Sequence, residues 1–292
     1  MKASINGTEI FFDVEGLQYV PDGPVMKERP VCFLIHGGPG IDHATYIPDV
    51  SRYSNFMQIV YVDNRGSGRS GRPDLATCTL EQNIEDLEAL RQYLGLEKIV
   101  VMGQPYGGFV SQGYALKYPE TVAALILIMT APCGEAIEDA KVELKKRGTP
   151  EQIAFGKRLF DGRFENDEQF TQLFNVLFNL YSCTRKELSQ EAMDANKRQI
   201  VSREIINNGF QTYVKTFDYR NALKSLNVPT LIIGGVEDWI TPVKYSYLMA
   251  NLINNSELKV FENCGHSVFV DAPDFLYAEI RQFIKKHLGH ND

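Results

Sequence analysis

Short apolar runs alternate with segments of helical periodicity along most of this chain. Residues 31–35 and 58–62 are apolar runs of strand length, whereas residues 80–94 repeat their apolar positions at a helical spacing. Continuously apolar strands that alternate with helices are typical of a parallel sheet covered on both faces. The pattern predicts further strands at 98–102, 122–129, 230–234 and 258–261, and further helices ending near 118 and at 243–252 and 275–287.

Two segments depart from this alternation. Residues 3–15 alternate around Asn6-Gly7, a dipeptide that favours a tight turn, so we expect an edge hairpin there. Residues 134–219 are charged and aromatic at helical spacing and show no strand signal. We therefore expect a core of residues 1–133 and 220–292, with a helical cap of residues 134–219 inserted in it. In open α/β sheets ligands bind at the carboxyl ends of the strands, where the cap would lie.

Composition narrows the classes of protein that fit. The 292 residues carry a net charge of −7 and show no basic stripe, which argues against a nucleic-acid partner. No apolar run approaches the roughly 18 residues of a membrane span, and the start of the chain lacks the apolar core of a signal peptide. The five cysteines are scattered, without the spacing of a metal site. We expect reduced thiols, no metal, no membrane partner and a cytoplasmic protein.

The most informative segment is Gly-Gln-Pro-Tyr-Gly-Gly at residues 103–108. It stands between a predicted strand and a predicted helix, as the nucleophile elbow G-x-S-x-G does, but Pro105 stands where that motif has serine. Proline has no hydroxyl, and its ring fixes φ at about −65°, whereas the strained elbow residue usually has positive φ. An alternative interpretation is a plain helix start, where proline is favoured. The surrounding glycines favour an elbow that has lost its nucleophile.

A glycine-rich loop follows the strand at 31–35. Glycines at this place let backbone N–H groups approach a substrate oxygen and form one half of an oxyanion hole, and the N–H of Tyr106 would form the other. An ordinary Gly/Pro loop is the alternative. The loop reads His36-Gly37-Gly38-Pro39-Gly40.

Two later loops carry a candidate acid and a candidate base. Asp238 follows the strand at 230–234, where a carboxylate could orient a histidine and stabilise its imidazolium form; Glu237 competes for this role, and a helix cap is the other use of Asp238. His266 follows the strand at 258–261 and is last in the order nucleophile, acid, base. A loop histidine without a role is the alternative.

The remaining candidates are structural or line a pocket. Arg65, in the glycine-rich loop at 63–68, is expected to bridge loops beneath the site. Aromatic residues of the cap are more often core than pocket. The candidates for lining a pocket are Tyr181, Phe210, Tyr213 and Trp239.

Together these residues resemble the α/β-hydrolase superfamily over nearly the whole chain. The loops at 36–40 and 63–68, with the elbow, look most like the prolyl iminopeptidase branch. The resemblance implies a serine aminopeptidase without metal or cofactor, which cleaves an N-terminal proline or another small residue from a small molecule or short peptide. It implies that Asp238 is the acid, His266 the base, and position 105 the nucleophile. It also implies that Gly38 and Tyr106 are the oxyanion donors. For the acids that bind the substrate amine, the candidates are Glu204 and Glu237.

Pro105 leaves three functions open. The first is a serine hydrolase, an aminopeptidase or a small amide or ester hydrolase, that is impaired in this chain. The second is a nucleophile-independent lyase or cofactor-free oxygenase in which His266 is the general base and Asp238 orients it. The third is a non-catalytic protein that binds a ligand in the same pocket. Retention of both His266 and Asp238 disfavours the third.

Overall fold

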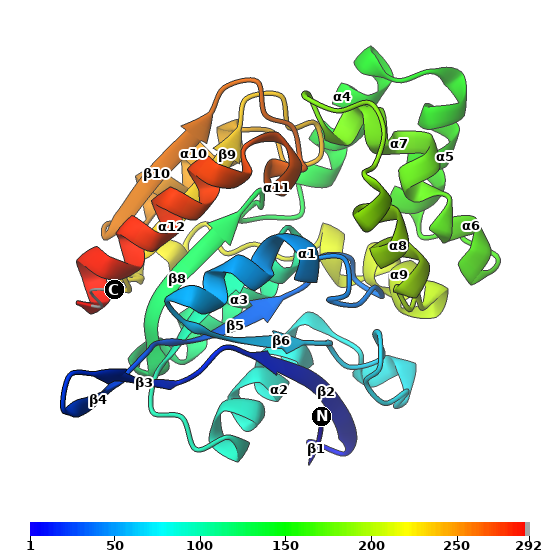
Figure 1. Ribbon diagram of the computed structural model, residues 1–292. Coiled ribbons are helices and arrows are strands. Elements are labelled where there is room, and N and C mark those ends of the chain that lie inside the picture. Colours follow the sequence, from blue (N-terminus) through cyan, green and yellow to red (C-terminus); the bar gives the residue numbers. More distant parts are fainter. Residues whose placement is uncertain (290–292) are drawn as a thin grey trace.

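An eight-stranded sheet forms the centre of the computed structural model, which describes residues 1–289 (Figure 1). The strand order is β1-β2-β6-β5-β7-β8-β9-β10. β1 and β2 pair antiparallel with each other, β2 pairs antiparallel with β6, and the pairs from β6 to β10 are parallel. The mostly parallel sheet confirms the predicted architecture. The strands are β1 (Lys2–Ile5), β2 (Thr8–Glu15), β5 (Val31–Ile35), β6 (Gln58–Val62), β7 (Ile99–Gly103), β8 (Val122–Ile128), β9 (Thr230–Gly235) and β10 (Ser256–Phe261).

Helices cover both faces of the sheet because its central strands are apolar on both sides. In β5, Phe33 and Ile35 join the core cluster of one face, and Cys32 and Leu34 join that of the other. The first face is covered by α2 (Leu80–Tyr93), α3 (Tyr106–Lys117) and α10 (Lys244–Leu252). The second is covered by α1 (Ile47–Val50), η1 (Ser51–Asn55), α11 (Val268–Asp271) and α12 (Pro273–Leu288).

Six helices between β8 and β9 gather beyond the carboxyl ends of the parallel strands (Figure 1). All of them fall inside residues 134–219, the segment expected to form the cap. We use the name cap for residues 134–219, which meet the loop at 36–40, where the Ser202 N–H donates to the Gly40 carbonyl at 2.8 Å. The helices are α4 (Ala136–Arg147), α5 (Pro150–Asp161), α6 (Asp167–Thr171), α7 (Leu173–Tyr181), α8 (Gln190–Arg198) and α9 (Arg203–Gln211).

The ends of the chain differ from the sequence expectation in detail. The edge hairpin turns at Asn6 and Gly7, whose φ angles are 46° and 75°, as predicted. A second hairpin, β3 (Tyr19–Asp22) and β4 (Val25–Glu28), was not predicted, because its residues are exposed or half-buried and carry no strand periodicity. α12 begins at Pro273, two residues before the predicted start. Short 3₁₀ turns complete the described chain: η2 (Leu75–Thr77), η3 (Pro119–Thr121), η4 (Tyr213–Lys215) and η5 (Ala222–Ser225).

Arg65 connects three segments beneath the carboxyl edge of the sheet, as expected. Its buried guanidinium binds both carboxylate oxygens of Asp86 in α2, each at 2.6 Å. It also donates to the Asn6 carbonyl at 3.3 Å and to the Thr77 hydroxyl at 3.1 Å. A bidentate pair of this kind fixes geometry as well as adding energy.

Replacing Arg65 by methionine should lower the free energy of unfolding by about 3–5 kcal/mol, because Asp86 would keep a buried charge without its partner. Urea unfolding followed by circular dichroism measures the loss. Arg158→Met on the exposed side of α5 is the matched control and should stay within about 0.5 kcal/mol of the parent. Equal losses for the two variants would show that the Arg65 pair does not hold the loops.

Candidate functional site

The predicted elbow is a tight strand-turn-helix in which Pro105 lies in helical conformation. β7 ends at Gly103 and α3 begins at Tyr106. Pro105 has φ −72° and ψ −41°, so the expected negative φ at this position is confirmed. A Cβ on Gly103 would clash with the backbone of Gly107, and a Cβ on Gly107 would clash with the Ile35 carbonyl. The two glycines therefore allow a turn that no larger residue would fit.

The loop at 36–40 lies directly beside Pro105. A Cβ on Gly37 would lie 2.9 Å from Cδ of Pro105. The Pro105 carbonyl accepts hydrogen bonds from the Thr130 hydroxyl at 2.6 Å and from the Gly108 N–H at 3.1 Å. Gly38, Pro105 and Tyr106 line one cavity. The structure thus brings the expected oxyanion donors together with position 105.

Asp238 and His266 form a buried hydrogen-bonded pair. Nδ1 of His266 lies 2.8 Å from Oδ2 of Asp238, and the two side chains are 6% and 0% exposed. The Asp238 carboxylate also accepts from the N–H groups of Ile240 and Thr241 at 2.8 and 3.0 Å, and from the Thr241 hydroxyl at 2.7 Å. These bonds hold the carboxylate where it binds Nδ1–H, so Nε2 is the nitrogen that accepts a proton.

Tyr46 and Gln104 connect the three loops of the site, although neither was predicted. The Gly37 N–H donates to the Tyr46 hydroxyl at 2.9 Å, and that hydroxyl donates to the Gln104 carbonyl at 3.2 Å. The Gln104 amide donates to the His266 carbonyl at 2.9 Å. Gln104 is the variable residue of the elbow motif, and Tyr46 lies in a loop without periodicity, so only the contacts show their role.

A neutral histidine ties the loop at 36–40 to the loop at 63–68. Nε2 of His36 accepts the N–H of Asn64 at 3.1 Å, so Nδ1 carries the proton and donates to the Gly37 carbonyl at 2.6 Å. Burial lowers the pKa of His36 and keeps the ring uncharged. The backbone that carries the Gly37 and Gly38 N–H groups is therefore fixed from below.

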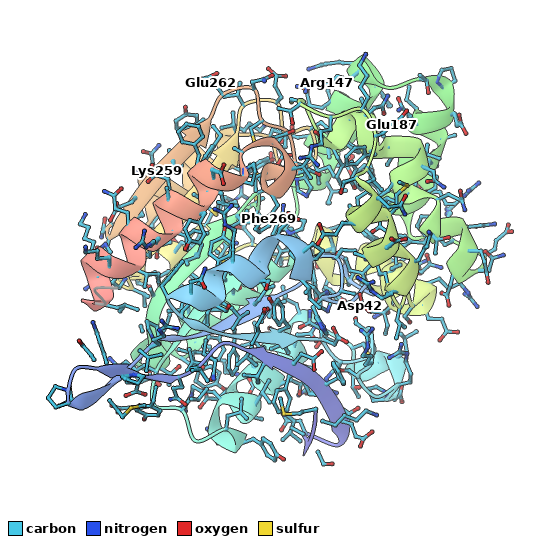
Figure 2. The ribbon with its side chains drawn as sticks, in the orientation of Figure 1. Asp42, Arg147, Glu187, Lys259, Glu262 and Phe269 are labelled. Carbon is cyan, nitrogen blue, oxygen red and sulfur yellow. The ribbon has the colours of Figure 1, made fainter. Side chains whose placement is uncertain are left out.

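The site opens into a cavity of about 510 Å³ between the core and the cap. His266 and Pro105 line it, and so do Tyr181 and Phe210, two of the aromatic residues proposed from the sequence. Phe269, labelled in Figure 2, lines it from α11 beside α1 and makes an edge contact with Tyr46 at a ring separation of 6.0 Å. A volume of this order is typical of small-molecule sites, which span about 300–1,000 Å³.

Four proposed substrate contacts lie outside the cavity lining. Trp239 is buried behind Tyr181, at a ring separation of 5.9 Å, and Tyr213 packs against Tyr106 at 6.1 Å. Glu237 pairs with Arg147 at 3.3 Å on the surface. The Glu204 side chain is 67% exposed. Their proposed roles gain no support from the lining.

The acidic side chains that line the cavity are Asp49 of α1 and Glu191 of α8. Burial raises the pKa of Asp49 to about 6; the negative charge of Glu191 adds to this rise, and Arg185 opposes it. Neither acid follows a strand, and no motif contains either one, so the sequence offered no signal for them.

Asp271 joins the cap to the loop that carries His266. Its carboxylate accepts from the Ser182 hydroxyl at 2.6 Å, the Cys183 N–H at 3.0 Å and the Thr184 N–H at 3.0 Å, all just after α7. It also accepts from the Gly265 N–H at 2.8 Å. Burial works to raise the pKa of Asp271, but the hydrogen bonds from Ser182, Cys183 and Gly265 hold it below its usual range.

Replacing Asp271 by asparagine should lower the free energy of unfolding by about 1–3 kcal/mol, because one oxygen becomes an NH₂ group that cannot accept these donors. A carboxyl with a depressed pKa stabilises the fold above its unfolded pKa and loses that contribution as the pH falls through its folded pKa. The difference in free energy of unfolding between the variant and the parent should therefore be largest above about pH 4 and decrease in more acid solution. Urea unfolding at pH 7 and at pH 3 measures it. Asp274→Asn, at a carboxylate 86% exposed, is the control; an equal loss there would contradict this role.

Residues 1–289 contain neither a cluster of metal-binding side chains nor a membrane-spanning helix. No group of three or more His, Cys, Asp or Glu stands close enough to hold a metal ion in this part of the chain. Within the same residues, none of the helices combines the length and the apolar character that a membrane crossing requires.

Comparison with known proteins agrees with this architecture. The family model described as the alpha/beta hydrolase fold matches residues 30–273. Proline iminopeptidase PfmaB of Pestalotiopsis fici is 31% identical over 290 residues, which cover 94% of this chain and 99% of that protein. A proline iminopeptidase of Lactobacillus helveticus is 28% identical, covering 89% of this chain and 92% of that protein. The solved proline iminopeptidase of Mycobacterium smegmatis is similar in fold, with a TM-score of 0.76, 18% identity and 98% of each chain covered.

Proposed function

Because this chain belongs to the α/β-hydrolase fold family, we propose that it holds the acyl-transfer site of a serine hydrolase with Pro105 at the position of the nucleophile. By its family the chain is a hydrolase, and its relatives are named as proline iminopeptidases. The predicted fold class and the resemblance to prolyl iminopeptidases are thereby confirmed. The substitution of a nucleophile at position 105 stays a prediction. We propose an amide or ester of a small molecule or short peptide as the substrate.

The observation that carries this proposal is the Asp238–His266 hydrogen bond, with His266 in the lining of the cavity that also contains position 105. A serine hydroxyl at 105 would attack the substrate carbonyl carbon while Nε2 of His266 takes its proton. The N–H groups of Gly38 and Tyr106 would bind the oxyanion, and His266 would return the proton to the leaving amine or alcohol. Water would then release the acyl group by the same route. Pro105 has no hydroxyl, so this chain lacks the attacking atom.

All five cysteines are free thiols, and four of them are buried. Unpaired thiols suit a reducing compartment, and we propose the cytoplasm. Disulfide mapping of protein isolated from its source tests this: intramolecular disulfides among these cysteines would contradict it.

A serine-directed probe tests the proposed function. A fluorophosphonate should label Pro105→Ser at residue 105: a bond forms between serine Oγ and phosphorus, the P–F bond breaks, fluoride leaves, and His266 takes the hydroxyl proton. Mass spectrometry of the digested protein locates the label. The original chain and Pro105→Ala should remain unlabelled. Failure of Pro105→Ser to react, or a label at another residue, would contradict the proposal.

The conformation of Pro105 favours one other function for the chain as it stands. Its φ of −72° suits a helix start without strain. His266, paired with Asp238, lines the same cavity as Pro105. His266 could then act directly on a bound substrate as a general base, as in a lyase or a cofactor-free oxygenase. Turnover by the original chain that is lost in His266→Ala would establish this function. Saturable binding without turnover would instead indicate a ligand-binding protein.

A further inference from the structure

The cavity has a buried apolar wall and an open polar mouth. The wall consists of aliphatic and aromatic side chains from the cap, each no more than 8% exposed; among them are Leu159, Phe160, Leu173, Phe178, Tyr181 and Phe210. The mouth lies between α1 and the segment that leads into α8, where the lining residues Arg185, Ser189 and Glu191 are exposed. A ligand therefore meets hydrocarbon at one end and charged groups at the other.

The wall is too extensive for a pyrrolidine ring to cover. Phe160 of α5, Phe178 of α7 and Phe210 of α9 line the cavity from three different helices. The cavity of about 510 Å³ also extends from the wall to His266 and Pro105. A small group would leave much of this surface without contact, whereas a larger ring or a branched chain would exchange water for close packing.

The charges at the mouth select against an anionic ligand. Asp49 and Glu191 contribute two carboxylates, and Arg185 contributes one guanidinium. Asp49 and Glu191 are close enough for the charge of Glu191 to raise the pKa of Asp49. A carboxylate or phosphate entering here would be repelled by more negative charge than it would find positive charge to pair with.

We propose that the acyl pocket takes a bulky apolar group, the side chain of an aromatic or branched residue, in preference to a prolyl group, and that acidic ligands are excluded at its mouth. This inference rests on the proposed function, because it assigns the cavity to the acyl side of the substrate. The acyl carbonyl lies at position 105, the apolar side chain lies along the cap wall, and the leaving group points to the mouth.

The chain contains one built-in reporter of this binding. Trp239 is the single tryptophan and is 1% exposed. Its indole makes edge contacts with Tyr181 and Phe160, at ring separations of 5.9 and 6.1 Å, and both of these rings line the cavity. A ligand that packs on the wall will shift the rings that surround the indole and change its fluorescence.

The experiment titrates the original chain with L-phenylalaninamide, L-leucinamide, L-prolinamide and 3-phenylpropanoate at pH 7.5. Trp239 fluorescence is the first readout, and calorimetry detects any ligand that binds without disturbing the indole. L-Phenylalaninamide should bind at least about tenfold more tightly than L-prolinamide, since each added methylene in an apolar pocket is worth tenfold or more. The affinity for L-leucinamide should lie between those for L-phenylalaninamide and L-prolinamide. The anionic 3-phenylpropanoate should bind more weakly than L-phenylalaninamide.

A variant at the mouth connects this binding to the cavity. Ala192 of α8 lines the cavity and is half-buried. Ala192→Phe should therefore lower the affinity for L-phenylalaninamide at least tenfold, because the larger side chain fills the entrance. Ala154→Phe, at an exposed position of α5 outside the lining, should leave the affinity unchanged. Thermal unfolding of both variants verifies that each is folded.

The outcomes separate this inference from the proposed function. Tighter binding of L-prolinamide than of L-phenylalaninamide, no binding of either by calorimetry, or equal affinities in Ala192→Phe and the parent would overturn the substrate class. The serine-directed probe at residue 105 decides the proposed function independently, because that reaction does not depend on the size of the acyl group.

Discussion

Replacing Pro105 by serine creates hydrolysis of short acyl esters and N-terminal aminoacyl arylamides, with a gain in kcat of at least several orders of magnitude. Loss of the nucleophile from such a triad costs about 10⁶-fold in kcat, and the oxyanion hole and binding supply what activity remains. The proposed acid and base are paired, because Nδ1 of His266 lies 2.8 Å from Oδ2 of Asp238, and His266 lines the cavity that contains position 105. Turnover of prolyl-, alanyl- and phenylalanyl-arylamides and of short esters measures the gain.

Two further variants show whether the gain comes from a serine that acts together with His266. Pro105→Ala removes the ring without adding a hydroxyl and should gain nothing. His266→Ala added to Pro105→Ser should remove most of the gain, because nucleophile and base act as a unit. The original chain should unfold cooperatively, as Pro105→Ser should, since the N–H that proline lacks falls at the start of α3. No gain on any substrate, together with His266-dependent turnover of another compound by the original chain, would favour the general-base function.

Replacing Asp238 by asparagine in the Pro105→Ser protein should lower kcat about 10⁴-fold, as loss of the acid does in triads of this kind. The buried carboxylate accepts a hydrogen bond from Nδ1–H of His266 at 2.8 Å, whereas an amide NH₂ in its place would favour the tautomer that has its proton on Nε2. His266 would then no longer accept the serine proton. Progress curves at saturating substrate measure kcat directly.

Asp218→Asn is the matched control for this substitution, because its exposed carboxylate pairs with Arg220 at 2.6 Å and lies outside the cavity lining. Activity in the control should remain within about twofold of the Pro105→Ser protein. If Asp238→Asn lowers kcat by less than about tenfold, Asp238 does not orient His266 and the pair is structural.

The sequence predicted the sheet and the placement of Asp238 and His266 because both depend on local signals. The apolar runs mark the buried strands, and each candidate loop follows the carboxyl end of one of them, so the fold brings these loops to one edge. The sequence register after the strand favoured Asp238 over Glu237. In the structure Asp238 binds His266, whereas Glu237 lies on the surface and pairs with Arg147.

Residues that act across long separations in sequence were not predictable. Asp49 and Glu191 line one mouth from α1 and α8, which are far apart in the sequence. Glu204, proposed from the sequence, lies in the first turn of α9, where an acid favours the helix dipole and remains in solvent. Tyr46 and Asp271 act through backbone groups of distant loops, and such contacts leave no periodic pattern in the sequence.

A crystal structure of the phosphonylated Pro105→Ser protein tests whether position 105 is the nucleophile position of an otherwise complete site. In that structure we expect the introduced serine to have positive φ, Nε2 of His266 to lie within hydrogen-bond distance of its Oγ, and a phosphonyl oxygen to accept from the N–H groups of Gly38 and Tyr106. An introduced serine that keeps the φ of −72° found for Pro105 and points its Oγ away from His266 would contradict the assignment of position 105 as the nucleophile position.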